Sequence, residues 1–170
     1  IAGFGAVRES YAWANYETSP GEYSFESKVM PKKIFDLAKE NSMTLDMNLV
    51  NRIWRNNIGA GTDSFMEMPI TQSELEKYEN YLKAYTADVK EMNGSVIYEI
   101  SNEWDLNMWN KTLSTVSTEE PLTIVKHYLA MVRTAYQTIK AEDPSAKVVG
   151  ITASLSNKML EFIKECAESG

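Results

Sequence analysis

Apolar and polar residues alternate along this chain with two different periods. A period of two residues is typical of strands, and a period of three to four residues is typical of helices. The first period predicts strands at 6–13 and 44–50, a strand that begins at Val96 and finishes on Asn102, Glu103 and Asp105, and a fourth strand within 143–154. The second predicts helices within 26–43 and 73–92, from Pro121 through Ile139, and within 157–169. Strands and helices therefore alternate four times, which favours parallel strands joined by crossover helices.

Apolar stripes predict which face of each helix is buried. The stripe of the helix within 26–43 consists of Ile34, Phe35, Leu37 and Ala38. The stripe of the helix within 73–92 consists of Leu75, Tyr78, Leu82, Tyr85, Val89 and Met92, and that of the helix from Pro121 consists of Val125, Tyr128, Leu129, Val132, Tyr136 and Ile139. Large side chains at this spacing are typical of core packing rather than of a ligand site.

Capping residues and polar segments predict where the helices begin and end. Ser73 and Glu76 fit a capping box at the start of the second helix, and Asn157 fits the N-cap of the last one. His127 lies off the stripe of its helix, so we expect a solvated histidine rather than a catalytic one. The segment 51–71, rich in Gly and Asn, is expected to be a loop.

Two folds suit this order of elements. A doubly wound sheet would be complete at this length, whereas a (β/α)8 barrel needs about 250 residues and would be about half present. No Gly-x-Gly-x-x-Gly or Walker loop follows a predicted strand, so phosphate binding has no support in the sequence. The pattern predicts an α/β fold and leaves the two architectures open.

Composition and charge narrow the function classes. The chain has 170 residues, a net charge of −7, one cysteine (Cys166) and one histidine. The acidic balance argues against nucleic acid as a partner, and a single Cys with a single His does not make a zinc site of the usual ligands. We expect no cofactor and no metal. No membrane span and no signal peptide are visible, so secretion and a cytoplasmic location fit equally well. The first residue is not Met and the last is Gly170, so we expect both ends to be cuts through a larger protein.

Polar side chains lie on one face of three successive strands. Arg8, Asp46 and Asn48 lie on the first two strands, and Glu103 ends the third on the same face as Glu99. In a barrel the carboxyl ends of the strands form the mouth of the active site, so these side chains would be brought together. Unpaired polar groups in a covered sheet are costly, which favours a use for them. Each has another interpretation: Arg8 would pair internally with Glu99, for instance, or the group would face solvent at the end of its strand.

A family resemblance rests on these same residues. The stretch "YEISNEWD" resembles the fourth-strand signature of clan A glycoside hydrolases, retaining (β/α)8 enzymes in which that strand ends in Asn-Glu. The segment "GFGAVRESYAWANYETSPGEYSF" is similar to their second strand and the turn that follows, "TLDMNLV" to their third strand, and "AEDPSAKVVG" to their fifth. The resemblance is closest to families 39 and 5, which are β-xylosidase-like and cellulase-like. It implies that residues 1–170 are a fragment of one catalytic barrel domain, from about its second to its fifth strand.

The resemblance also implies roles for individual residues. Glu103 would be the general acid/base, Asn102 would hydrogen-bond the sugar 2-hydroxyl, and Arg8 would support the carboxylate of the nucleophile. Trp13 and Trp109 are candidates for lining sugar subsites, and a packed tryptophan is the equally weighted alternative for each.

Asp46 and Asn48 are further candidates for contacts with the substrate. Two positions beside the acid/base depart from the family pattern, since Ser101 stands where Trp is common and Trp104 where Pro is common. The family's nucleophile lies on a strand that this chain would not contain.

The predicted function is therefore part of a retaining glycoside hydrolase that acts on O-glycosidic bonds of oligo- or polysaccharides. Retaining hydrolysis needs two carboxyl groups, so we expect the isolated chain to be inactive. We also expect it to self-associate through exposed barrel edges. Two alternatives stay open at this point: a carbohydrate-binding protein without hydrolysis, and a self-contained α/β interaction domain.

Overall fold

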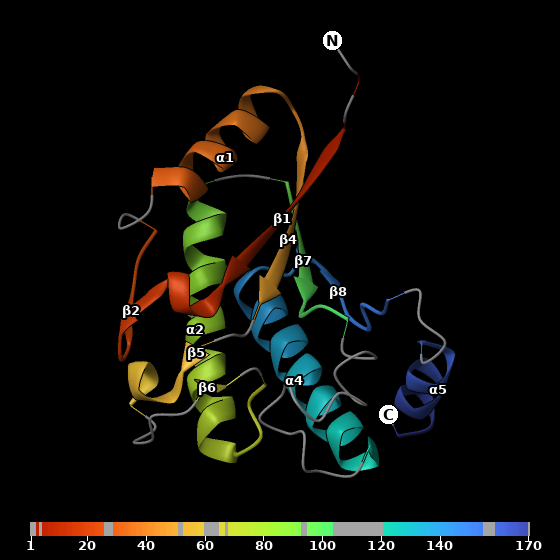
Figure 1. The fold of residues 1–170 in the computed structure, drawn as a ribbon. Helices are drawn as coiled ribbons and strands as arrows, with labels where there is room; N and C mark the ends of the chain where they lie inside the picture. Colours follow the sequence, from red (N-terminus) through yellow and green to blue (C-terminus); the bar gives the residue numbers. More distant parts are fainter. Residues whose placement is uncertain are drawn as a thin grey trace.

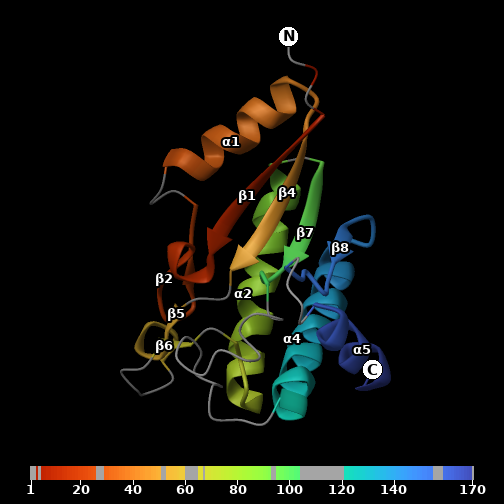
Figure 2. The ribbon, with the colours of Figure 1, turned by 45° about the vertical axis from the view of Figure 1, so that its right-hand side comes forward.

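Four parallel strands form the main sheet of the molecule. The computed structural model describes residues 3, 5–25, 29–50, 53–59, 65–66, 68–92, 95–103, 121–154 and 159–169. Within them the sheet has the order β1 (Ala6–Ala12), β4 (Thr44–Val50), β7 (Val96–Ile100) and β8 (Lys147–Val149). The helices α1 (Val29–Glu40), α2 (Gln72–Glu91) and α4 (Pro121–Glu142) lie between successive strands in the chain, and α5 (Met159–Ser169) follows β8. In both ribbon views α2 and α4 lie side by side on one side of the sheet (Figure 1, Figure 2).

The strand order decides between the two predicted architectures. Each strand of the main sheet pairs with the next one along the chain, whereas a doubly wound sheet reverses its strand order partway across. A sheet in sequential order, with helices covering one face, is the arrangement of a (β/α)8 barrel. The predicted partial barrel is confirmed and the doubly wound alternative is wrong.

The core lies between the sheet and its helices. Leu45, Met47 and Leu49 of β4 are buried there, and Tyr98 of β7 contacts Tyr85 of α2 with ring centroids 6.4 Å apart. The predicted stripes are largely confirmed, because the following residues are all buried: Phe35, Ala38, Tyr78, Leu82, Tyr85, Val89, Val125, Tyr128, Leu129 and Ile139.

The prediction of burial is wrong for two residues of the stripes. Leu37 is 56% exposed and Tyr136 is 53% exposed. Each lies at the margin of an apolar stripe, where helical spacing alone does not show how far the neighbouring element extends. Tyr81 of α2, which the stripe left out, is fully buried and stacks on Trp13 with ring centroids 4.9 Å apart.

Short elements that the sequence pattern did not predict lie beside the main sheet. They are a 3-10 helix at Trp13–Asn15, the antiparallel pair β2 (Glu17–Ser19) and β3 (Glu22–Tyr23), the antiparallel pair β5 (Ile53–Trp54) and β6 (Phe65–Met66), and a 3-10 helix at Arg55–Ile58. Strands β5 and β6 and the 3-10 helix at Arg55–Ile58 lie inside the segment 51–71, which was expected to be a loop. Strands of two or three residues are too short to show a period, which is why the pattern missed them.

The N-terminus of α2 corrects the predicted capping box. Thr71 and Glu74 form the box: the Thr71 hydroxyl accepts from the Glu74 N–H at 3.2 Å, and the Glu74 carboxylate accepts from the Thr71 N–H at 3.1 Å. The predicted box of Ser73 and Glu76 has the same spacing two residues further on, so spacing alone did not separate the two pairs.

Two further expectations concerned His127 and the cap of the last helix. His127 of α4 is partly buried, and Asn157, the predicted cap of the last helix, lies outside the described residues. Within the described part of the chain, no helix has the length and hydropathy needed to cross a bilayer.

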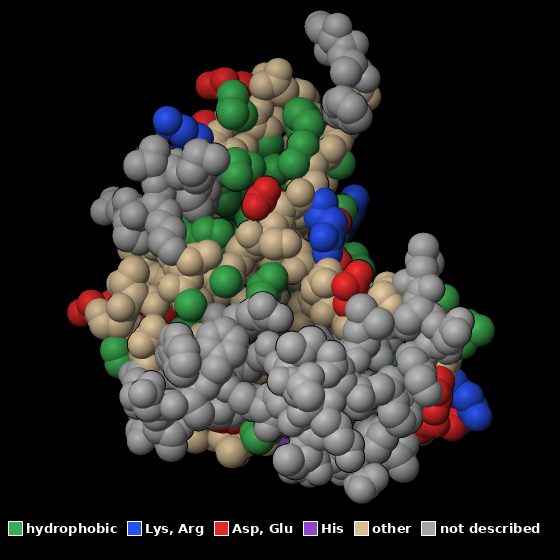
Figure 3. Space-filling model, viewed as in Figure 1, with side chains coloured by type: hydrophobic (Ala, Val, Ile, Leu, Met, Phe, Trp, Pro, Cys, Tyr) green, Lys and Arg blue, Asp and Glu red, His purple; other side chains and the backbone are tan. Residues whose placement is uncertain are grey.

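The face of the sheet opposite the helices is polar. It carries Arg8 and Ser10 from β1, Asp46 and Asn48 from β4, and Glu99 from β7, on the alternation that the sequence predicted. Figure 3 has the same view as Figure 1 and shows basic and acidic side chains close together over the sheet. We call this surface the inner face, because it would line the interior of a closed barrel.

Candidate active site

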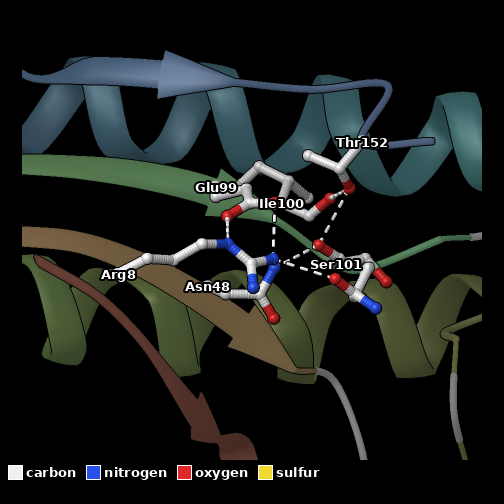
Figure 4. A network of polar contacts seen from close by, with 7 residues as sticks. Arg8, Asn48, Glu99, Ile100, Ser101 and Thr152 are labelled. Atoms are coloured by element: carbon white, nitrogen blue, oxygen red, sulfur yellow. Dashed lines mark hydrogen bonds and ion pairs between the residues drawn. The ribbon is translucent and has the colours of Figure 1, made fainter. Parts of the chain in front are cut away.

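Arg8 extends across the inner face and joins two strands that are not neighbours. It starts on β1, crosses β4, and donates from Nε to Oε2 of Glu99 at 2.6 Å and from Nη2 to Oε1 at 2.8 Å (Figure 4). The Glu99 side chain is 10% exposed and that of Arg8 is 47% exposed. The hydrogen bond to Glu99 raises the pKa of Arg8, and the charges of Asp46 and Glu103 add to it. The internal pairing named as an alternative for Arg8 is therefore present.

The same guanidinium holds the residue beside the predicted acid/base. Nη2 of Arg8 donates to Oδ1 of Asn102 at 2.9 Å. Because the charge of Glu103 contributes to the pKa of Arg8, its carboxylate lies within electrostatic reach of the guanidinium. The structure thus brings Arg8, Asn102 and Glu103 together, beyond the carboxyl end of β7.

The expected path of the third strand is wrong at its end. β7 ends at Ile100, so strand alternation does not set the direction of Glu103. Ser101 and Glu103 have φ angles of 65° and 50°, in the left-handed region, and the Glu103 N–H donates to the carbonyl of Thr152 at 2.9 Å. The Glu103 side chain is exposed.

A second segment beside this turn also has a left-handed residue. Ile151, which follows β8, has a φ of 56°, and its N–H donates to the hydroxyl of Tyr128 at 2.8 Å. For a β-branched residue this is an unusual conformation. Left-handed non-glycine residues cost about 1–3 kcal/mol each and cluster at functional sites. Three of them, Ser101, Glu103 and Ile151, lie on two adjoining segments at the end of the sheet.

Asn48 lies beneath this turn and is fully buried. Its Nδ2 donates to the Ser101 carbonyl at 2.5 Å, and the Thr152 hydroxyl donates to the same oxygen at 2.9 Å (Figure 4). The sequence named Asn48 as a substrate contact. In the structure its amide is directed to the turn, and the side chain has no exposed surface.

Asp46 lies on β4 beside Arg8, and one of its carboxylate oxygens lacks a hydrogen bond within the described part of the chain. Its Oδ1 is buried and has no hydrogen-bond partner among the described residues. Burial raises the pKa of Asp46, as does the charge of Glu99, while Arg8 opposes the shift. The carboxyl group therefore holds its proton more tightly than an ordinary aspartate does, although it shares the inner face with a cation.

Of the two tryptophan candidates, one lies within the described residues. Trp13 is fully buried, stacks on Tyr81, and donates from Nε1 to the Glu17 carboxylate. It belongs to the core, which is the packed alternative, and a subsite role for it is wrong in this chain. Trp109 lies outside the described residues.

Sequence reasoning missed one residue of the site and underrated another. Thr152, which contacts the turn twice, follows a strand too short to signal its end, and no pattern marked it. Glu99 was considered only as a pairing alternative, yet it anchors the guanidinium. Among the described residues no group of three His, Cys, Asp or Glu side chains is placed to hold a metal ion. The arrangement offers an exposed carboxylate, a fixed amide and a fixed cation.

Comparisons with known proteins give a match by structure and none by sequence. No family model matches the chain, and no curated protein matches it either. A family 39 glycoside hydrolase from the gut symbiont Bacteroides cellulosilyticus WH2 superimposes with a TM-score of 0.62 at 19% identity, over 88% of this chain and 26% of that one.

Two further structures have the same likeness. The β-glycosidase BGL167 superimposes with a TM-score of 0.65 at 17% identity, over 98% of this chain and 48% of that one. The exo-β-1,4-mannosidase Op5Man5 from Opitutaceae bacterium strain TAV5 superimposes with a TM-score of 0.59 at 19% identity, over 87% of this chain and 25% of that one. The chain therefore has a glycoside hydrolase-like fold, and it spans about a quarter to a half of the length of these structures.

Proposed function

We propose that this chain is the part of a retaining glycoside hydrolase that carries the general acid/base, Glu103. The observation that carries the proposal is the hydrogen bond from Arg8 to Asn102, which fixes an Asn-Glu pair at the carboxyl end of a parallel sheet. The glycoside hydrolase-like fold supports it, since active sites of such barrels lie at that end of the strands. The sequence "NE" at 102–103 agrees with the family resemblance.

The proposed chemistry divides between this chain and a longer polypeptide. Glu103 protonates the leaving oxygen and later takes a proton from water, and Asn102 binds the sugar 2-hydroxyl. A second carboxylate, about 5–5.5 Å from Glu103, attacks the anomeric carbon. On this proposal that carboxylate comes from outside the chain.

The charges beneath the turn support this division of roles. Arg8 is bonded to Glu99 and to Asn102, so it orients the Asn102 amide. The same guanidinium is positive and close to Glu103. A carboxylate arriving from outside the chain would find a fixed cation on the inner face, which favours its ionised form.

Hydrolysis of aryl glycosides by the isolated chain tests the proposal. We expect no turnover by the chain alone, because half of the two-carboxylate machinery is absent from it. Turnover that Glu103→Gln abolishes would show that the chain is complete and would overturn the division. The exposed Glu9→Gln is the matched control, since it removes a carboxylate from β1 rather than from the turn.

We also propose that the isolated chain self-associates. Val149, Ile151 and Leu160, near the β8 side of the sheet, are 44%, 37% and 72% exposed. Open sheet edges with apolar side chains favour pairing between copies. Light scattering tests this: we expect dimers or larger species, and a monodisperse monomer at high concentration would contradict it.

A further inference from the structure

The turn that presents Asn102 and Glu103 is held from two sides by side chains whose purpose is otherwise unexplained. From β4, Asn48 Nδ2 donates to the Ser101 carbonyl. From the segment after β8, the Thr152 hydroxyl donates to the same carbonyl at 2.9 Å. A carbonyl oxygen has two lone pairs, and both are used here.

Backbone bonds complete the attachment on the same two sides. The Ser101 N–H donates to the Leu49 carbonyl at 3.2 Å, and the Glu103 N–H donates to the Thr152 carbonyl at 2.9 Å. Thr152 therefore contacts the turn through its hydroxyl and through its backbone. Ser101 and Glu103, the two left-handed residues of the turn, each donate one of these bonds.

The burial of Asn48 shows that its amide has a role. Its side chain has no exposed surface, and its Oδ1 has no hydrogen-bond partner among the described residues. A buried parallel strand is normally rich in Val, Ile and Leu, so an amide with an unsatisfied oxygen is unfavourable at this position. The bond from its Nδ2 to the Ser101 carbonyl offsets that burial.

Thr152 is itself held by a strained neighbour. Ile151 has a left-handed φ, and its N–H is bonded to the hydroxyl of Tyr128 from α4. Strain of this kind persists only where the surrounding structure determines it. The bond from α4 thereby fixes the segment from which Thr152 reaches the turn.

We propose that Asn48 and Thr152 are positioning residues, a two-sided clamp on the Ser101 carbonyl that holds the left-handed turn and so sets the direction of Asn102 and Glu103. The clamp itself depends only on the contacts above. Its part in catalysis rests on the proposed function of Glu103.

Thr152 offers the sharpest test, because one variant removes the hydroxyl that forms the clamp and another keeps it. Thr152→Val keeps the shape and removes the hydroxyl, whereas Thr152→Ser keeps the hydroxyl. In this chain, NMR of the Ser101 and Glu103 Cα and Cβ nuclei reports their backbone angles, and amide hydrogen exchange reports the bond of the Glu103 N–H. We expect Thr152→Val to shift these signals and to speed exchange at Glu103 by about 3- to 10-fold, in keeping with one lost hydrogen bond. Thr152→Ser is expected to restore both.

Asn48→Leu tests the other side, and Thr86→Val is its matched control. Thr86 is also fully buried, but it lies on α2, away from the turn. We expect Asn48→Leu to move the turn signals while those of α2 stay in place, and Thr86→Val to leave the turn unchanged. Unchanged turn signals in Asn48→Leu, or equal effects of Thr152→Val and Thr152→Ser, would overturn the clamp. If Asn48→Leu does not fold, the two Thr152 variants decide alone.

The catalytic part has a separate readout. In the longer polypeptide that we propose, Thr152→Val should lower kcat with little change in KM, and Thr152→Ser should recover it. A Glu103→Gln variant of the longer polypeptide as active as its parent would refute the proposed function while leaving the NMR result on the clamp intact.

Discussion

Replacing Arg8 with methionine tests how far the inner face depends on one cation. Arg8 donates two hydrogen bonds to Glu99, whose side chain is only 10% exposed. Hydrogen bonds to a charged group contribute about 1.5–3 kcal/mol, but Arg8 is 47% exposed, and solvent screens part of that. We therefore expect Arg8→Met to lower the free energy of unfolding by about 1–2 kcal/mol at pH 7.

Lys83→Met is the matched control for this prediction. Lys83 is also 47% exposed and forms an ion pair with Glu79 at 2.6 Å, but Glu79 is 41% exposed. A pair of this kind on a helix surface contributes about 0.3–0.5 kcal/mol. The two variants thus remove cations of equal exposure and differ in how deeply the carboxylate is buried.

Urea denaturation of both variants at pH 7 measures the difference. Adding Glu99→Gln to Arg8→Met should recover part of the loss at pH 7. The reasoning is refuted if Arg8→Met costs no more than Lys83→Met, or if Glu99→Gln does not reduce its cost.

Three further predictions concern other parts of the fold. Burial raises the pKa of Asp46, so the ionised group destabilises the folded chain above the unfolded pKa of about 3.9. Asp46→Asn should therefore raise Tm at pH 7, by at most about 2–4 °C, and the gain should vanish near pH 3; a lower Tm at pH 7 would contradict this. Thr71→Ala should lower the free energy of unfolding, measured by urea denaturation, by about 0.5–2 kcal/mol, and Ser73→Ala should leave it almost unchanged, because only Thr71 caps α2. A larger loss for Ser73→Ala than for Thr71→Ala would contradict this assignment of the cap. Phe162→Ala should cost about 3–5 kcal/mol, as its buried ring packs on Tyr128 at 5.1 Å between centroids, while Tyr136→Ala, on the exposed side of α4, should cost far less; similar thermal shifts for both would count against this packing.

The fold was predictable where the sequence pattern was long and the environment regular. β4 has the bounds predicted for it, 44–50, and the buried faces of α2 and α4 follow the apolar spacing. Strand order was not predictable from the apolar pattern, because local patterns do not say which strands pair. The family resemblance implied the order of a barrel, and the register of β1 with β4 and of β4 with β7 confirms it.

The site was predictable as a set of residues but not as a geometry. The sequence brought Arg8, Asn102 and Glu103 to the end of the sheet, and the structure places them together. It did not show that β7 ends at Ile100, since the left-handed turn that follows is held by bonds from other segments. Strand alternation therefore failed where tertiary contacts replaced it, at the position with the proposed function.

The dependence of hydrolysis on the leaving group tests the proposed role of Glu103 most directly. In the longer polypeptide that supplies the second carboxylate, Glu103→Gln should slow hydrolysis of glycosides with poor leaving groups by about 10²–10⁴-fold. Glycosides with activated aryl leaving groups need no protonation, and their first step should slow by about tenfold or less. Equal losses on both classes of substrate, or no loss on either, would contradict a general acid at Glu103.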